Sequence, residues 1–325
     1  MRPTDAGQFA AQERGELPAV LALRENTWAI PIPLPVAAPP YTLTYVLADA
    51  AGDLHVVDPG WDAEGNLERL DDALRMLGGS VDRVATVTVS HLHADHLGLA
   101  GRIREASGAR VALHSAEQGA LDGGGQTLPD YSDWGVPLEL HEEFTALVGR
   151  ARPWFAADVL LEHGDALDIP GRDVRVLHTP GHTIGHLSLW EPLEQLLFTG
   201  DLLLPTIFPG IGLGGPAPDA IADYLASLDQ IEALGDPEVC PGHGYVFRGL
   251  AERCAETRAH QLGRTGEVER IVAEHPQATV WEVASHVTWT EGWHNLHGLH
   301  LASALSQTAM RMRYASAHES GRRTA

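Results

Sequence analysis

Lysine is absent from this 325-residue chain, which carries all 22 of its basic charges on arginine against 44 acidic residues. The formal net charge is −22. Residues 245–325 hold nine arginines and eight acids, so the acidic excess lies in the first 244 residues. A negative field repels phosphate backbones, whose neutralisation provides most nucleic-acid affinity. Nucleic acid is therefore disfavoured as a partner, although a local basic groove in an acidic chain is not excluded.

Cysteine and long apolar runs are also scarce. Cys240 and Cys254 are the only cysteines, so no disulfide framework supports a secreted fold. We interpret Cys240 as a small buried strand residue. No apolar run approaches the ~18 residues of a membrane helix, and five charged residues among the first twenty exclude the apolar core of a signal peptide. We expect a cytoplasmic protein without a membrane partner, with one large and one small domain.

The segment His91-Leu-His-Ala-Asp-His96 follows an apolar, strand-like run, Val84–Val89. Strand residues alternate between faces, so His91 and His93 can point the same way at the end of that run. Asp95 and His96 then fall where the chain turns into a segment that we expect to be helical. One short loop can thus present two imidazoles to one metal, and a carboxylate with an imidazole to a second.

Three further residues with metal-ligand chemistry occur downstream. His182 lies in a Pro-Gly-His turn after a strand-like run, Asp201 ends an apolar run at a Thr-Gly-Asp turn, and His243 lies in Pro-Gly-His-Gly. Loops at the ends of strands on a rigid scaffold are where chemistry is commonly presented. The three residues are therefore candidate partners of the first motif.

Together with Val57-Asp-Pro-Gly60, these segments resemble the metallo-β-lactamase-fold hydrolase superfamily, of the glyoxalase II and beta-lactamase-like endoribonuclease type. The likeness covers roughly residues 20 to 245, with the segments in the expected order. Strands alternating with helices already predict an α/β layered fold. The resemblance implies a four-layer αβ/βα sandwich as a catalytic domain over residues 1–245, with the metal loops along one edge.

The resemblance also implies a ligand set. One divalent ion would be held by His91, His93 and His182, and a second by Asp95, His96 and His243, with Asp201 bridging the two. Imidazole and carboxylate favour zinc, while iron and manganese also fit. Two such ions lower the pKa of a shared water towards ~7, so that hydroxide is the expected nucleophile.

Four residues near these ligands have expected supporting roles. We expect Asp95 to act as the catalytic proton acceptor besides binding metal. Asp58 is expected to orient ligand histidines, the alternative being a structural role in its turn. His178 and His186 flank His182 and are interpreted as strand or supporting residues.

Periodicity predicts several elements of the sandwich. Tyr41–Ala48 and Leu54–Asp58 alternate like the two strands of a hairpin. Leucines at spacings of three and four predict a helix over Asn66–Leu77, and a similar stripe predicts one over Asp219–Leu234. The segment Leu97–Ile103 is also expected to be helical.

The pattern loosens over residues 121–161. A glycine-rich break is followed by Tyr131, Trp134, Trp154 and Phe155 around an expected helix, Leu138–Val148. Aromatics between flexible joints suit a lid over the metals. They equally suit the core of an insertion that packs on the sandwich, and both interpretations stay open. The glycine- and proline-rich segment 205–218 is a second candidate rim.

Residues 246–325 read as a small helical domain. Four helices are expected, separated by Gly263, Pro276 and Gly292: Leu250–Leu262, Val268–Glu274, Val280–Val287 and Leu296–Tyr314. This order resembles the winged-helix-like C-terminal domain of the beta-lactamase-like endoribonuclease branch, although no β wing is evident. Three histidines at three-residue spacing, His294, His297 and His300, are interpreted as packing or solvated residues.

These features favour a metal-dependent hydrolase of a small ester, thioester or lactone, as in the glyoxalase II and lactonase branches. The alternative is an endoribonuclease or phosphodiesterase, which needs a basic track near the metals; its candidates are Arg150, Arg152, Arg172 and Arg175. A third hypothesis is a binding module whose C-terminal helices engage a partner, or, in its milder form, a homodimer.

Overall fold

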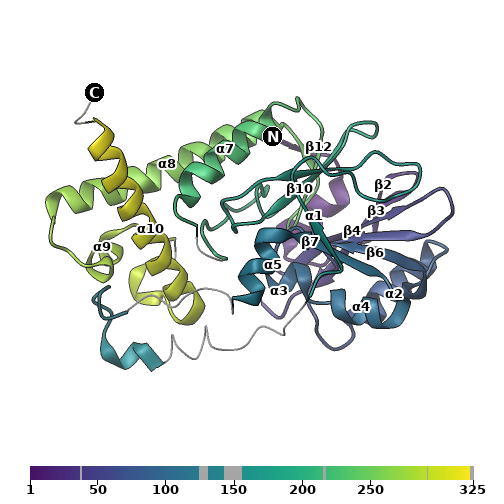
Figure 1. Ribbon diagram of the computed structural model, residues 1–325, viewed down its shortest axis with the longest axis horizontal. Coiled ribbons are helices and arrows are strands. Elements are labelled where there is room, and N and C mark those ends of the chain that lie inside the picture. The colour runs from purple at the N-terminus through teal and green to yellow at the C-terminus, as the bar shows by residue number, and fades with distance from the viewer. Residues whose placement is uncertain (37–38, 124–130, 143–155, 215–216, 291, 323–325) are drawn as a thin grey trace.

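The computed structural model describes residues 1–36, 39–123, 131–142, 156–214, 217–290 and 292–322. Two sheets lie face to face with helices outside them, and a group of C-terminal helices extends to one side (Figure 1). No helix in these described ranges combines the length and the apolar character needed to cross a bilayer.

The first sheet has seven strands in the order β2-β3-β4-β5-β6-β7-β8. The predicted hairpin is confirmed, because β4 and β5 pair antiparallel with Ala48 opposite Leu54. From β5 to β8 the strands run parallel, so their carboxyl ends share one edge. The strands are β2 (Leu21–Arg24), β3 (Thr27–Pro33), β4 (Tyr41–Ala48), β5 (Leu54–Val57), β6 (Val84–Thr88), β7 (Arg110–His114) and β8 (Val159–Leu161).

The second sheet has six strands in the order β1-β13-β12-β11-β10-β9. Its strands β11 and β12 are parallel neighbours, so the turns that follow them also lie at one edge. The strands are β1 (Arg2–Pro3), β9 (Arg175–His178), β10 (Leu187–Glu191), β11 (Leu196–Gly200), β12 (Glu238–Pro241) and β13 (Phe247–Arg248).

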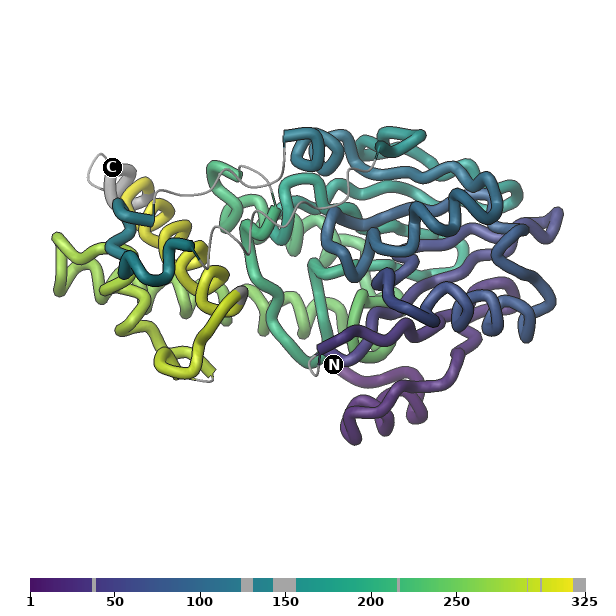
Figure 2. The backbone as a smooth tube through the Cα atoms, turned by 90° about the horizontal axis from the view of Figure 1, so that it is seen from below, coloured from purple at the N-terminus to yellow at the C-terminus, as the bar shows by residue number. Residues whose placement is uncertain are grey.

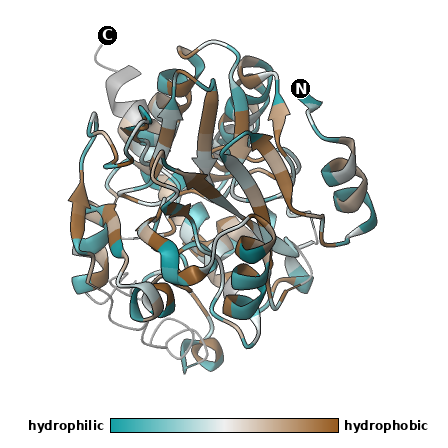
Figure 3. Cartoon of the chain, turned by 90° about the vertical axis from the view of Figure 1, so that its right-hand side faces the viewer, coloured by the Kyte–Doolittle hydropathy of each residue, from teal (hydrophilic) through white to brown (hydrophobic). Residues whose placement is uncertain are grey.

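Apolar side chains fill three successive interfaces. Between the sheets, the rings of Tyr45 and Phe198 meet edge to face with centroids 5.0 Å apart. Leu70 and Leu74 of α2 (Asn66–Met76) and Ile103 of α4 (Ala100–Ser107) pack on the outer face of the seven-stranded sheet. Helix α7 (Ala220–Glu232) and the start of α8 (Leu250–Glu274) cover the other sheet. Figure 3 shows the hydrophobic strands enclosed by helices with hydrophilic outer faces. The predicted four-layer αβ/βα sandwich is confirmed.

The helices predicted over Asn66–Leu77 and Asp219–Leu234 are present, with ends that differ by at most two residues. The expected helix Leu97–Ile103 is divided, since α3 ends at Leu97 and α4 begins at Ala100. Between them Gly98 packs closely on the chain, because an added Cβ would meet the Asp62 nitrogen at 2.5 Å. The helices are α1 (Ala6–Arg14), α2 (Asn66–Met76), the 3-10 turn η1 (Val81–Arg83), α3 (Ala94–Leu97), α4 (Ala100–Ser107), α5 (Ser115–Asp122) and α7 (Ala220–Glu232).

The C-terminal part consists of α8 (Leu250–Glu274), α9 (Val280–His286), the 3-10 turn η2 (Trp293–Asn295) and α10 (Gly298–Arg322). The expected break at Gly263 is wrong, since α8 continues through it. Glycine costs a helix only about 1 kcal/mol, and Gln261 and Thr265 on either side are buried against Arg311 of α10. Within the described residues after Arg248 there are helices and turns but no strand, so the winged-helix resemblance is not confirmed.

Residues 131–142, the described part of the aromatic insertion, pack on the C-terminal helices. Tyr131 and Val136 share an apolar cluster with Leu301 and Leu305 of α10. The backbone N–H of Trp281 in α9 also donates to the backbone carbonyl of Trp134 at 2.9 Å. Figure 2 shows this teal segment beside the yellow helices. It is thus part of a core, but one formed with the helical part instead of the sandwich; residues 143–155, with Trp154 and Phe155, lie outside the described ranges.

Candidate metal centre

Four strand ends of the two sheets bring the predicted ligands together. The loop after β6 carries His91 and His93, and α3 then begins and carries Asp95 and His96. The turns after β9, β11 and β12 carry, in that order, His182, Asp201 and His243. All seven predicted residues meet at this edge.

The nitrogens of the first three histidines converge. His91 Nε2 lies 2.9 Å from His93 Nδ1, which lies 3.1 Å from His182 Nε2. On the other side of the site, His243 Nε2 is 3.2 Å from Asp95 Oδ2 and 3.5 Å from Asp201 Oδ1. The groups whose ligand atoms all lie within 4.8 Å of one another are His91–His93–His182, His91–His96–Asp201 and Asp95–His96–His243.

Asp201 lies between the two sets. Its Oδ2 is 3.7 Å from His182 Nε2, whereas its Oδ1 is 3.4 Å from His96 Nε2. One carboxylate therefore faces both sets of imidazoles, as a bridging ligand would.

The opposite nitrogen of each of these histidines lies against an oxygen, and this fixes the direction of the ring. The pairs are His91 Nδ1 with Ser90 Oγ (2.9 Å), His93 Nε2 with the Leu213 carbonyl (3.0 Å), His96 Nδ1 with Asp58 Oδ2 (2.9 Å), His182 Nδ1 with the Gly210 carbonyl (2.7 Å) and His243 Nδ1 with the Tyr41 carbonyl (2.7 Å). An imidazole that donates through one nitrogen offers a lone pair on the other, which is the form that binds metal.

Two buried atoms at the centre show that the residues fit a cation. His96 Nε2 and Asp201 Oδ1 are both buried and, although they lie 3.4 Å apart, neither forms a hydrogen bond with any described group. Leaving such groups unpaired away from water costs about 1–3 kcal/mol each, and more for a charged group. A divalent ion would satisfy both, and the nitrogen and oxygen donor set is the one that zinc, iron and manganese accept.

The pKa shifts of the histidines also indicate a site that binds positive charge. Burial lowers the pKa of His91 well below its usual value, and the neighbouring His96 and His93 lower it further, so this imidazole is neutral. Burial also opposes charge on His243, yet Asp201 and Asp95 raise its pKa to about 10. The carboxylates of this pocket therefore stabilise positive charge strongly, whether it is a proton or a metal ion.

Two glycines allow the backbone to approach this closely. A Cβ on Gly242 would stand 2.6 Å from Asp201 Oδ1 and 2.7 Å from His96 Cε1. At Gly200, where φ is 45°, a Cβ would stand 2.7 Å from Ser90 Oγ and 2.8 Å from His186 Nε2. The glycine in each turn is therefore required by the space around the ligands.

Asp58 contacts both a candidate ligand, His96, and the backbone of the first loop, so the expected orienting role and a structural role are combined in one side chain. Its Oδ1 accepts from the Ser90 nitrogen at 2.7 Å, and its Oδ2 accepts from Ser90 Oγ at 2.8 Å and faces His96 Nδ1. Asp58 adopts φ of 51°, a left-handed conformation that is uncommon outside glycine. His186 is likewise a supporting residue, since its Nε2 accepts from the Asp201 nitrogen at 3.1 Å.

Sequence reasoning missed Glu117 on α5. This side chain is fully buried, and its carboxylate accepts from the Leu92 nitrogen at 2.7 Å and the Gly185 nitrogen at 2.6 Å. It thus joins the loop of His91 and His93 to the turn that follows His182. In the sequence it reads as an ordinary acidic residue in the first turn of a helix, so no local signal distinguishes it.

Two of the arginines proposed for a nucleic-acid track are already paired. Arg172 forms a buried ion pair with Glu191 at 2.6 Å, and Arg175 pairs with Asp173 at 2.8 Å. Arg150 and Arg152 lie outside the described ranges. Cys240 is buried in β12, as predicted.

The family model of the Metallo-beta-lactamase superfamily matches residues 38–243, more than half of the chain. The chain belongs to this superfamily. Its members are metal-dependent hydrolases, and the convergent histidines and aspartates described above are consistent with that activity. The match ends at His243, the last candidate ligand, so the C-terminal helices lie beyond it.

Curated relatives and a solved structure agree with this assignment. An uncharacterized protein of Mycobacterium tuberculosis H37Rv is 32% identical over 219 residues, covering 64% of this chain and 88% of that protein. The acyl-coenzyme A thioesterase MBLAC2 of Gallus gallus is 28% identical over 247 residues, covering 71% and 83%. A metallo-beta-lactamase family protein of Thermus thermophilus superposes with a TM-score of 0.73 at 26% identity, covering 92% and 95%. Because the superposition covers 92% of this chain, the similarity to the Thermus thermophilus structure extends into the C-terminal helices.

Proposed function

We propose that this chain hydrolyses thioesters of small acyl groups, such as acyl-coenzyme A, with two divalent ions held by the seven convergent side chains. The observation that carries the proposal is the pair of unsatisfied buried atoms, His96 Nε2 and Asp201 Oδ1, at the meeting point of two ligand sets. The likeness to an acyl-coenzyme A thioesterase favours thioesters over the esters and lactones also expected from the sequence.

Within this proposal, His91, His93 and His182 hold one ion, Asp95, His96 and His243 hold the second, and Asp201 faces both. Zinc is our first choice, with iron and manganese as alternatives that the same ligands accept. When bound, two such ions polarise a carbonyl oxygen and lower the pKa of water towards ~7.

Asp95 is the proposed proton acceptor. Burial alone would raise its pKa, but the facing His96 and His243 hold the pKa below its ordinary value, so the carboxylate is ionised. Its side chain is 23% exposed against 12% for Asp201, so Asp95 is the carboxylate that solvent and substrate reach. An ionised, accessible carboxylate can accept a hydrogen bond from a water that enters the site, which is the basis of this proposed role.

We also propose that residues 1–245 form the catalytic domain and 246–325 a helical domain. The last strand of the sandwich, β13, ends at Arg248 and α8 begins at Leu250, so the change from sheet to helix lies a few residues after the proposed boundary. A cytoplasmic location and homodimerisation stay predictions.

Metal analysis and a substrate panel test the proposed function. Protein purified without chelator is expected to contain about two divalent ions per chain. A panel of acyl thioesters, lactones, phosphodiesters and single-stranded RNA is expected to show thioesters as the fastest substrates.

Two variants connect the activity to the site. His93→Ala and Asp95→Ala should abolish turnover while the circular dichroism spectrum stays that of a folded protein, whereas His294→Ala, an exposed histidine of η2, should change neither. A metal content near zero would contradict the proposed centre, and RNA cleavage that exceeds thioester hydrolysis would contradict the proposed substrate.

A further inference from the structure

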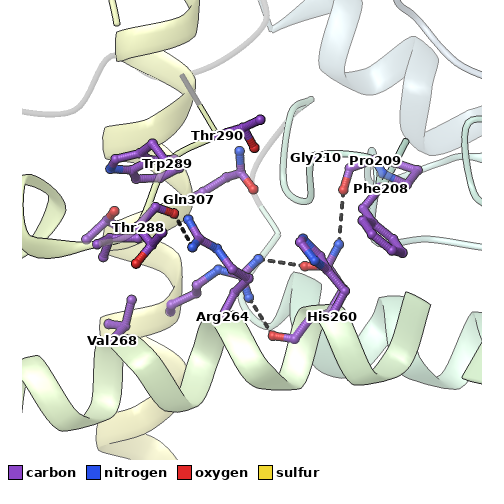
Figure 4. A pocket seen from close by; sticks show the side chains of 14 residues that line it. Phe208, Pro209, Gly210, His260, Arg264, Val268, Thr288, Trp289, Thr290 and Gln307 are labelled. Carbon is purple, nitrogen blue, oxygen red and sulfur yellow. Dashed lines mark hydrogen bonds between the residues drawn. The ribbon is translucent and has the colours of Figure 1, made fainter. Parts of the chain in front are cut away.

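A cavity of about 540 Å³ lies between the helical part and the loop that backs the metal centre. Phe208 and Gly210 of that loop form one wall, and α8, α10 and the segment after α9 form the others (Figure 4). The described lining residues are Phe208, Pro209, Gly210, His260, Gln261, Arg264, Val268, Val287, Thr288, Trp289, Thr290, Gln307, Thr308 and Arg311.

The charge of this cavity is opposite to that of the chain. Its described lining contains Arg264 and Arg311 but no aspartate or glutamate, although the protein carries 44 acids and 22 arginines. Burial lowers the pKa of His260 in its wall, and Arg264 and Arg311 lower it further, as expected where positive potential gathers. A cavity of this kind suits a small anion.

Arg311 is the more unusual of the two arginines. Its side chain is buried and donates to the Gln261 carbonyl at 3.0 Å, Gln261 Oε1 at 2.6 Å and Thr265 Oγ1 at 2.8 Å. Among the described residues no carboxylate lies within ion-pair distance of it, whereas Arg264 pairs with Glu267 at 2.8 Å. A buried guanidinium held by neutral groups alone keeps an uncompensated charge, which is costly unless an anion joins it.

The cavity and the candidate metal centre share one residue, Gly210. Gly210 lines the cavity, and the carbonyl of the same Gly210 accepts the hydrogen bond of the ligand His182 at 2.7 Å. Three residues further along this loop, the Leu213 carbonyl faces His93 Nε2 at 3.0 Å. One loop therefore forms both the back of the metal centre and a wall of the basic cavity.

We propose that this cavity binds the phosphate-bearing end of the thiol carrier while the acyl thioester lies at the metal centre. This inference rests on the proposed function and adds a subsite to it. Arg311 and Arg264 would supply charge-assisted hydrogen bonds to phosphate oxygens, and Gln307 and Thr290 would supply neutral polar contacts. The C-terminal helices then select the carrier, and the sandwich performs the hydrolysis.

Kinetics of the metal-loaded enzyme on two substrates test this subsite. One substrate is an acyl-coenzyme A, and the other is the same acyl group on N-acetylcysteamine, which lacks every phosphate. In Arg311→Gln, KM for the coenzyme A thioester should rise about 10- to 100-fold, the usual effect of losing a hydrogen bond to a charged group. Both kcat and the KM for the truncated thioester should stay within about twofold of wild type.

Thr290→Asp provides a second variant, since Arg311→Gln also removes hydrogen bonds between α8 and α10. Thr290 is exposed at the cavity, so an aspartate there adds a repelling charge without disturbing the core. Its matched control is Thr290→Asn. The control for Arg311 is Arg313→Gln, an exposed arginine of α10 two residues away that removes the same charge from the chain.

The outcomes separate this subsite from the proposed function. If Arg311→Gln and Thr290→Asp leave the KM of the coenzyme A thioester unchanged, or raise the KM of both thioesters equally, the cavity is not a phosphate subsite, although thioester hydrolysis stands. If the wild type hydrolyses neither substrate, the proposed function fails. Calorimetric titration with coenzyme A then still tests the cavity, because tighter binding to wild type than to Thr290→Asp supports the subsite and equal or absent binding overturns it.

Discussion

Replacing Glu117 with glutamine should weaken metal binding, because Glu117 holds the backbone of two loops that carry candidate ligands. Its carboxylate accepts one backbone N–H from Leu92, between two candidate ligands, and one from Gly185, three residues after His182. The side chain thus fixes two loops that approach the same ion from different sheets. Glu117→Gln preserves the shape of the side chain but turns one acceptor oxygen into an NH2 group that faces a buried N–H.

The size of the effect follows from these two hydrogen bonds. Hydrogen bonds to a charged group contribute about 1.5–3 kcal/mol each, and a buried N–H left unpaired costs about 1–3 kcal/mol. Glu117→Gln should keep one bond in weakened form and lose the other, a destabilisation of about 3 kcal/mol. Since domains are stable by about 5–15 kcal/mol, the variant should remain folded. Residues that orient metal ligands typically change metal affinity by about 10- to 100-fold, and we expect a loss in this range.

Two measurements on the same preparations check this prediction. Urea unfolding gives the change in free energy, and titration with a metal-buffering chelator gives the affinity. Glu105→Gln, an exposed glutamate of α4, removes an equal charge and should change neither quantity. If the affinity of Glu117→Gln matches that of wild type and its unfolding free energy differs by less than about 0.5 kcal/mol, the two hydrogen bonds do not hold the loops as argued.

Two further substitutions test the glycine turns and the pH response. Gly242→Ala should lower kcat about 100-fold and cause loss of metal, because the alanine Cβ would displace Asp201 and His96 by several tenths of an ångström or more. An unchanged kcat and metal content would show that the turn shifts instead. Asp71→Asn should cost about 1 kcal/mol at pH 7, measured by urea unfolding, since Asp71 accepts from the Val81 nitrogen at 2.8 Å and this bond lowers its pKa. A carboxylate whose pKa is lower in the folded state stabilises the fold above its unfolded-state pKa, and this stability is lost as pH falls through its folded-state pKa. The difference in unfolding free energy between wild type and Asp71→Asn should therefore vanish towards pH 2. A difference that persists at pH 2 would contradict the stabilising role of the Asp71 carboxylate.

The seven convergent residues could be found from the sequence because each lies in a short segment that follows a strand. The alternation of Val84–Val89 and the glycine turns before Asp201 and His243 are local patterns, and parallel neighbours place such ends at one edge. Local patterns therefore marked these side chains as candidates, and the family resemblance grouped them into one ligand set. The groups that orient the rings could not be found in this way, because the carbonyls of Gly210 and Leu213 carry no sequence signature and depend on how one loop packs.

The helical part was predicted less well because its structure depends on packing between segments far apart in the chain. Gly263 reads as a break, yet α8 continues because Arg311, nearly fifty residues later, bonds to Gln261 and Thr265 on either side of it. The aromatic insertion was predicted to cover the metals or pack on the sandwich, whereas Tyr131 joins α10. In both cases the deciding partner lies beyond the reach of periodicity.

The distribution of charge is compatible with the proposed anionic substrate, although the chain as a whole is strongly acidic. RNA is held by many phosphate contacts along a basic track. Of the four arginines expected to form one, the two within the described residues, Arg172 and Arg175, are paired with Glu191 and Asp173. A substrate with phosphates at one end alone needs only one basic site, and Arg311 offers a buried charge that no described carboxylate neutralises. The acidic surface then opposes long polyanions more than short ones, since each added phosphate meets repulsion without a new partner. The same arrangement predicts that salt should weaken coenzyme A binding only modestly, because few counterions are released.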